Sequence, residues 1–241
     1  MGAFPVRLPL MITRKNARRA AFALASPALL LSACAEAPSE DQEGADAEPQ
    51  DAFFEALSSH CGKAFAGKLA SEDAVDADFA KAEMVMHVRE CSDEQIAVPF
   101  HVGMKDEAGE VEWDRSRTWL ITRTETGLRL KHDHRHEDGE SDKVTMYGGD
   151  TAAGEGGAGT ARAQDFPVDD FSIEMFERED LAASVTNVWT VEVDAADVKD
   201  GTFAYQLKRT VAGGAPVDRL FRVEFDLTQQ VTAPPAPWGH K

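Results

Sequence analysis

The chain has 241 residues, 25 of them basic and 43 acidic, which gives a formal net charge of −18 at pH 7. A surface this acidic repels phosphate backbones and anionic headgroups, so the composition excludes nucleic acid and anionic bilayer surfaces as partners of the folded part. The length allows one domain of ordinary size with a substantial core.

The N-terminal region carries the pattern of a secretory signal peptide. Four basic residues between Arg14 and Arg19 precede an apolar stretch, residues 20–31, that is too short to span a bilayer as a helix. The stretch runs into the sequence LSAC at positions 31–34, which resembles the lipobox of bacterial prolipoproteins.

The lipobox resemblance implies where the protein is located in the cell. It implies that residues 1–33 are removed, that Cys34 becomes the diacylated first residue, and that Ala35 directs delivery to the outer membrane, facing the periplasm. Loss of residues 1–33 removes five basic residues and no acidic ones, which changes the net charge from −18 to −23. Each buried CH₂ of an acyl chain contributes roughly 0.8 kcal/mol, so two or three chains hold a protein firmly at the membrane.

Two segments follow the predicted lipidation site. Residues 34–50 are rich in Ala, Glu, Asp and Pro, with almost no large apolar side chain, and predict an acidic, disordered tether. We expect the single folded domain to cover residues 51–241. It begins with DAFFEALSS at 51–59, whose apolar residues lie at helical spacing and predict a short capping helix.

The remaining cysteines predict a disulfide. With Cys34 assigned to lipid, Cys61 and Cys91 form an even pair in an oxidising compartment. Neither has His or Cys beside it at a clear metal-ligand spacing, which favours a disulfide over a metal site.

Alternation of apolar and polar residues predicts an all-β, mainly antiparallel domain. Strands are predicted over residues 83–89, 96–102, 111–123, 128–136, 144–147, 188–194, 202–209 and 220–227. So many short strands favour a barrel or a sandwich. The Gly-rich stretch at about 148–170 is expected to be a long loop, either a floppy insertion or a lid over a cavity. Trp238, in the Pro-rich tail, is expected to dock back on the domain.

The hairpin over residues 111–139 holds the densest chemistry. Alternation places one set of residues on one face of its first strand: Trp113, Arg115, Arg117, Trp119 and Ile121. The matching face of its second strand holds Leu128, Leu130, His132, His134 and His136.

The loop length decides which residues of this hairpin meet. An even loop pairs Trp119 with His132 and Arg117 with His134, whereas an odd loop places Asp114, Ser116 and Thr118 beside the histidines. We favour the even register because it opposes apolar with apolar residues near the turn and keeps like charges apart.

In the even register, the face grades from apolar to cationic. A cavity with these two ends suits an amphipathic anion such as a fatty acid, because arginine forks match carboxylates. The predicted ligand contacts are Trp113, Arg115, Arg117, Trp119, His132 and His134. Alternatively, the polar end simply meets water, with arginine packed on tryptophan.

The histidines also allow a metal site at His132, His134 and His136, since His-x-His on a strand brings two imidazoles to one face. Together with Glu140, the last two resemble the first motif of metal-binding cupins. Four nearby basic side chains oppose a bound cation, and solvated or structural histidines are the simpler interpretation.

Several motifs of the mature domain resemble a group of bacterial secreted lipoproteins of uncharacterised activity. The matching segments are WDRSRTW (113–119), KHDHRHEDG (131–139), YGG (147–149) and PPAPWG (234–239). The order of a short helix followed by antiparallel strands is similar to lipocalin-like barrels, although Phe65-Ala66-Gly67 stands in the region of the lipocalin Gly-x-Trp. The resemblance implies a membrane-anchored envelope protein and no particular activity.

Three functions therefore stay open. The first is a lipoprotein that binds a small amphipathic anion in a barrel cavity. The second is a metal-binding protein or metal-dependent enzyme, and the third is a structural lipoprotein that contacts another envelope protein. The sequence has no nucleophile-elbow, zinc-peptidase or dinucleotide-binding motif, which favours binding over catalysis, and we expect no cofactor.

Overall fold

The structure, a computed structural model, describes residues 48–151 and 159–240. The predicted signal peptide, Cys34 and most of the predicted tether lie outside the described residues. The tether prediction extends two residues too far, because Pro49 and Gln50 already belong to the first helix.

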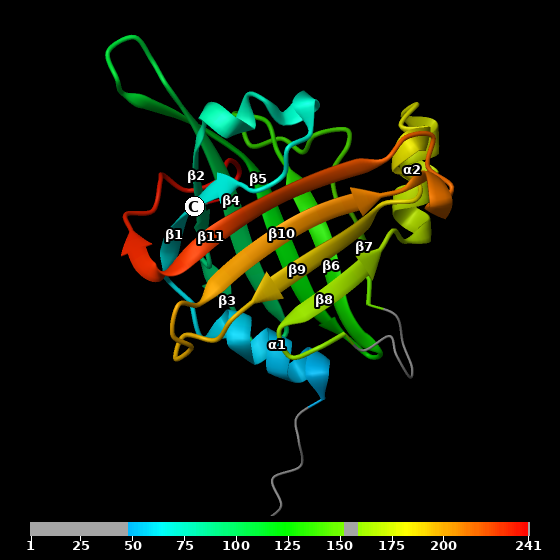
Figure 1. The fold of residues 1–241 in the computed structure, drawn as a ribbon, viewed down its shortest axis with the longest axis horizontal. Coiled ribbons are helices and arrows are strands. Elements are labelled where there is room, and N and C mark those ends of the chain that lie inside the picture. The colour runs from blue at the N-terminus through cyan, green and yellow to red at the C-terminus, as the bar shows by residue number, and fades with distance from the viewer. Residues whose placement is uncertain (1–47, 152–158, 241) are drawn as a thin grey trace, which may run out of the picture. The chain divides into compact units, whose positions relative to one another are not determined.

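The described chain folds into one antiparallel sheet with helices at its ends (Figure 1). Its strands pair in the order β7-β6-β5-β4-β2-β1-β11-β10-β9-β8, with β3 beside β4. The strands are β1 (Ala64–Leu69), β2 (Glu83–His87), β3 (Glu90–Cys91), β4 (Gln95–Lys105), β5 (Val111–Thr124), β6 (Gly127–His134), β7 (Tyr147–Asp150), β8 (Ala163–Pro167), β9 (Val188–Val193), β10 (Thr202–Arg209) and β11 (Arg219–Val231). The helices are α1 (Pro49–Ser58), α2 (Asp170–Arg178) and the short η1 (Ala74–Asp76), η2 (Phe79–Lys81), η3 (Ala182–Ser184) and η4 (Val211–Gly213).

The sheet curls until its two edge strands, β7 and β8, meet and nearly close a barrel. A single antiparallel bridge joins Gly149 to Val168, and the Asp169 amide donates to the Gly148 carbonyl over 3.1 Å. We call this junction the seam. A Cβ on Gly149 would lie 1.8 Å from the Pro167 carbonyl oxygen, so only glycine allows the strands to approach this closely. The predicted all-β, mainly antiparallel fold is confirmed, and of the two expected architectures, barrel or sandwich, the domain forms the barrel.

Helix α1 plugs one end of the barrel. Phe53, Phe54 and Leu57 lie on its inner face and are at most 1% exposed. The guanidinium of Arg123, at the end of β5, lies 4.2 Å from the Phe54 ring centre and pairs with acidic residues of the helix. The opposite end of the barrel, where η1 and η2 lie, is called the mouth (Figure 1).

The predicted disulfide is present. Cys61 and Cys91 are bonded, with their Cα atoms 6.2 Å apart. The bond ties the chain just after α1 to β3, which pairs with β4. It therefore fastens the plugging helix to the sheet.

The Gly-rich stretch at 148–170 is not one long loop, so that prediction was wrong. Gly148 and Gly149 are buried in β7, residues 163–167 form β8, and α2 begins at Asp170. The strand predicted at 144–147 instead covers 147–150. The glycine content suggested a loop, whereas Gly148 and Gly149 allow the strands to pack closely at the seam. Residues 152–158 of the stretch lie outside the described residues.

Candidate functional site

The hairpin of β5 and β6 adopts the predicted even register. Ile121 pairs with Leu130, Trp119 with His132, and Arg117 with His134. Leu130 and Ile121 are fully buried, and His132 is 2% exposed. The inner face of this hairpin therefore grades from apolar near α1 to polar near the mouth.

Beyond Arg117, on its mouth side, the predicted face is interrupted. Phe100 pairs with Arg117 but Val102 pairs with Asp114, so β5 carries one extra residue between these pairs, a β-bulge. The bulge shifts the alternation, and Asp114 takes the inner position beyond Arg117. Trp113 and Arg115 were predicted on the inner face and instead lie on the outer one.

On the outer face of β5, both Trp113 and Arg115 contact other parts of the protein. Trp113 pairs with Gly103 and lies edge-on to the buried ring of His101, with ring centres 6.4 Å apart. Arg115 donates to the Ala236 carbonyl over 2.7 Å, and the Trp238 amide donates to the Arg115 carbonyl over 3.1 Å. Trp238 thus docks back on the barrel, as predicted.

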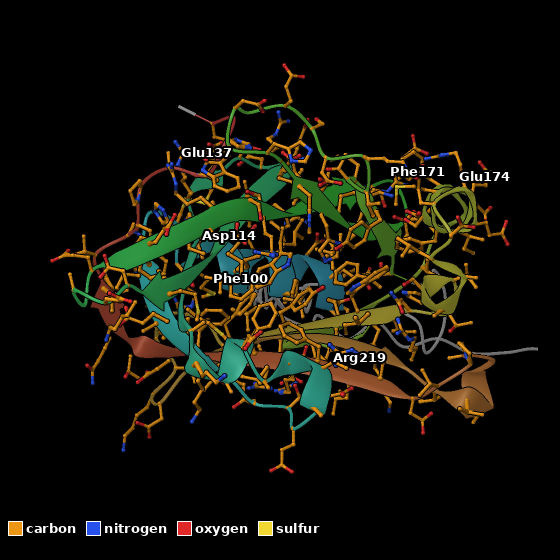
Figure 2. All side chains as sticks on the ribbon, turned by 90° about the horizontal axis from the view of Figure 1, so that it is seen from above. Phe100, Asp114, Glu137, Phe171, Glu174 and Arg219 are labelled. Atoms are coloured by element: carbon orange, nitrogen blue, oxygen red, sulfur yellow. A yellow bond between two sulfur atoms is a disulfide. The ribbon has the colours of Figure 1, made fainter. Side chains whose placement is uncertain are left out.

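Aromatic rings fill the middle of the barrel. Trp119 stacks between Phe100 of β4 and Tyr205 of β10, with ring centres 4.9 and 4.4 Å away, and Phe203 lies 6.0 Å away. Figure 2, which looks from the mouth side, shows Phe100 pointing into the barrel and Glu137 outside it. This layer forms a floor below the polar residues at the mouth.

His132 is held as a neutral imidazole above this floor. Its Nδ1 lies 3.0 Å from the Tyr147 carbonyl oxygen, which can only accept, so Nδ1 carries the proton. Nε2 then accepts from the Tyr205 hydroxyl at 2.7 Å. Burial lowers the pKa of His132 to about 3, and burial raises the pKa of Tyr205.

His134 and Tyr147 form a second pair nearer the mouth. The Tyr147 hydroxyl lies 3.2 Å from Nε2 of His134. Burial, with the neighbouring charge of Arg117, lowers the pKa of His134 to about 4, and burial raises the pKa of Tyr147 to about 12. Both groups are therefore neutral at pH 7.

Two arginines supply positive charge at the mouth. Arg117 Nη1 lies 2.5 Å from Asp114 Oδ2. Although burial opposes the ionisation of Asp114, hydrogen bonds from Ser116 and the charge of Arg117 hold the pKa of its carboxyl below the usual value. Arg219 of β11 pairs with the buried Asp76 from η1.

These groups line a cavity of about 200 Å³. Its walls come from β4, β5, β6, β7, β10, β11, η1 and η2. The lining residues are Asp76, Phe79, Phe100, Arg117, Trp119, His132, His134, Tyr147, Tyr205, Leu207, Arg219 and Phe221. The volume is below the roughly 300–1,000 Å³ of pockets that enclose drug-sized ligands.

An open groove of about 750 Å³ adjoins the cavity, since Phe79 and Arg117 line both. The groove also contacts the bulged part of β5 and the C-terminal tail. Its other lining residues are Asp78, Val102, Met104, Val111, Glu112, Trp113, Asp114, Arg115, Glu137, Pro235 and Trp238. The six predicted ligand contacts thus divide: four line the cavity, and Trp113 and Arg115 line only the groove.

The three histidines of the metal hypothesis do not share a point. His132 and His134 have ring centres 6.4 Å apart, and both ring nitrogens of His132 already have partners. His136 lies beyond the end of β6, is exposed, and lies near Asp142. Within residues 48–151 and 159–240, no group of three or more His, Cys, Asp or Glu side chains is placed to hold a metal ion.

Several cavity residues were missed by sequence reasoning. Tyr205 and Arg219 occupy the same alternating positions as the core residues of their strands, so their inward direction could have been found. The order of strand pairing, which brings them opposite β5 and β6, could not. Asp76 and Phe79 come from short helical turns that have no periodic pattern.

Comparison with known proteins adds no relatives: a scan against family models and searches of curated proteins and of solved structures found no match. In the part of the chain that the structure describes, no helix is both long and apolar enough to cross a membrane.

Proposed function

We propose that this protein is a lipid-anchored lipoprotein of the bacterial cell envelope whose barrel mouth binds a small amphipathic anion. The anchor is Cys34, released as the first residue by removal of residues 1–33. The proposed location is the periplasmic face of the outer membrane, on the strength of the lipobox and of Ala35.

One observation carries the binding proposal: a single cavity is lined by Arg117, Trp119 and His132. These residues provide a guanidinium, an aromatic wall and a neutral polar wall. Arginine's planar fork matches a carboxylate, and aromatic walls favour an apolar neighbour.

The size of the cavity limits the ligand. The layer around Trp119 and the α1 residues Phe53 and Phe54 fill the rest of the barrel, so a long acyl chain has no room below the cavity. The anionic group belongs in the cavity beside Arg117, and the apolar part extends past Phe79 into the groove. A medium-chain carboxylate meets both requirements.

Calorimetric titration of the mature protein with octanoate tests this proposal. We expect a Kd between millimolar and micromolar, about −4 to −8 kcal/mol, and no binding of octanol or octyltrimethylammonium at the same concentrations. Arg117→Gln should weaken octanoate at least tenfold, because it removes a charged hydrogen-bond donor worth roughly 1.5–3 kcal/mol.

Arg129→Gln is the matched control, since Arg129 forms an ion pair with Asp150 outside the cavity and the groove. It should leave octanoate binding unchanged. Equal binding of octanol and octanoate, or no binding of any of the three probes, would refute the proposal.

A further inference from the structure

Residues 71–82, between β1 and β2, lie at the mouth on the side of β11, and we call them the lid (Figures 1 and 2). Asp76 and Phe79 of the lid line the cavity. Phe79 packs edge-on against Phe221 with ring centres 5.1 Å apart. The lid is also held by the Arg222 amide, which donates to Ser71 Oγ over 3.0 Å.

The firmest contact of the lid is a forked ion pair with Arg219. Nη1 of Arg219 lies 2.7 Å from Oδ2 of Asp76, and Nη2 lies 2.6 Å from Oδ1. Asp76 is 3% exposed, and Asp73 adds a contact of 3.1 Å to the same guanidinium. This two-bond geometry is the one in which a guanidinium recognises a free carboxylate.

A second arginine lies directly opposite Arg219. Arg209 of β10 pairs with Arg219 in the ladder, on the same face as Tyr205. Like charges placed directly opposite destabilise a sheet unless acids lie between them. Nε of Arg209 is buried and has no hydrogen-bond partner among the residues that the structure describes. The strands thus supply fixed cations, while Asp73 and Asp76 come from the lid.

We propose that Arg219 binds the ligand's carboxylate together with Arg117, which lines the same cavity, and that Asp76 is the internal stand-in for that carboxylate. The ligand's carboxylate takes the place of the Asp76 carboxylate on Arg219, and the lid loosens as Asp76 moves into water. Exchanging one carboxylate for another never leaves the guanidinium unpaired, which avoids the main cost of breaking a buried ion pair. This inference rests on the proposed function and names the class of ligand: a monocarboxylate with a compact apolar tail.

Hydrogen–deuterium exchange of the mature wild-type protein, with and without octanoate, tests the displacement directly. We expect residues 71–82 to exchange at least threefold faster in saturating octanoate, while β4 and β5 exchange more slowly. Slower exchange of the lid in octanoate would overturn the inference, because it would mean that the ligand binds beneath a closed lid.

Variants provide a second, independent readout. Asp76→Asn removes the competing charge with little change in shape, and should bind octanoate three- to tenfold more tightly than the wild type. Arg219→Lys retains the charge but loses the fork, and should bind it at least fivefold more weakly. Asp150→Asn, which removes a surface partner of Arg129, is the control and should not change binding.

The outcomes separate the two proposals. Wild-type binding with unchanged or weaker binding by Asp76→Asn overturns this inference and leaves the proposed function standing. Binding by Asp76→Asn alone overturns both proposals, because the wild type then binds no octanoate and its Asp76 is not displaced. No binding by either protein overturns both.

Discussion

Trp119 contacts aromatic rings from three other strands. Phe100, Tyr205 and Phe203 stack on or beside its ring, and Phe225 meets it edge-on at 6.5 Å. Because it also forms the floor of the cavity, one side chain couples the stability of the core to the shape of the site.

Replacing Trp119 with alanine should lower the free energy of unfolding by about 3–5 kcal/mol, since it leaves a large void among the aromatic rings that pack on it. Urea denaturation at pH 7 measures this loss. Phe171→Ala is the control, because Phe171 is 55% exposed and its loss should cost less than about 1 kcal/mol. Similar losses for both variants would contradict the assigned role of Trp119.

The buried histidine predicts a pH dependence. His132 has a pKa of about 3 in the folded protein, against 6.5 when unfolded. Below about pH 6.5 the unfolded state binds more protons at this residue than the folded state does. The contribution of neutral His132 to the free energy of unfolding is therefore fully present above about pH 6.5 and is lost progressively as the pH falls toward 3. At pH 5.5 the loss from this one group is about 1.4 kcal/mol.

Urea denaturation at pH 7.5 and 5.5 checks this sign and size. The stability difference between the two pH values should be smaller by about 1.4 kcal/mol in His132→Gln than in the wild type. His136→Gln, at an exposed position, should keep the wild-type difference. An unchanged pH dependence in His132→Gln would show that this group is not buried in its neutral form.

At the scale of elements, the disulfide links a helix to the sheet that it plugs. Cys61 and Cys91 are 30 residues apart in sequence, so their bond removes much of the freedom of the unfolded chain. The chain-entropy estimate for such a loop is roughly 3–4 kcal/mol.

The double variant Cys61→Ser/Cys91→Ser should therefore unfold at a lower temperature, with a stability loss of roughly 3–4 kcal/mol. Thermal unfolding with and without a phosphine reductant measures it. The reductant should destabilise the wild type toward the variant and leave the variant unchanged. Equal melting temperatures for the two oxidised proteins would contradict this prediction.

The elements also mark how far the sequence could predict the fold. β10 was predicted with its exact bounds, because its apolar and polar residues alternate over all eight positions. The start of β11 was predicted within one residue, but its end was placed four residues too early, because the alternation stops at Leu227. The bulge in β5 was not, since residues on both sides of it are polar or amphipathic and give no sign of the shift. β8 and α2 were not predicted because they follow a glycine-rich stretch, whose glycines in β7 are required by the close approach of the two strands at the seam.

The candidate site was predictable to the same degree. The register of β5 and β6 follows from local cross-strand pairing, and it placed Arg117, Trp119 and His132 correctly. The other side of the cavity comes from elements that are far in sequence from the β5–β6 hairpin, and these contribute Tyr205, Arg219 and Asp76. Their meeting depends on barrel closure, which no local pattern encodes.

At the scale of the whole molecule, the proposed anchor gives a clear expectation for location. Wild-type protein expressed in a bacterium that processes lipoproteins should pellet with membranes and incorporate labelled palmitate at Cys34. Cys34→Ser should do neither, because roughly 0.8 kcal/mol per buried CH₂ is lost with the chains. Membrane fractionation and palmitate labelling measure both.

Cys61→Ser is the control for that experiment, since it removes a cysteine of the folded domain and should keep both the label and the membrane association. Persistence of the label in Cys34→Ser would contradict the lipobox assignment.

The seam has a consequence for how the barrel fluctuates. One bridge, between Gly149 and Val168, joins β7 to β8, whereas β10 and β11 are paired over eight positions. Local opening starts where neighbouring strands share the fewest backbone hydrogen bonds. We therefore expect β7 and β8 to separate at the seam before any other pair of neighbouring strands does. Tyr147, whose carbonyl orients His132, is the first residue of β7. The strand of the cavity wall that opens first, β7, is thus the one that fixes the tautomer of the buried His132.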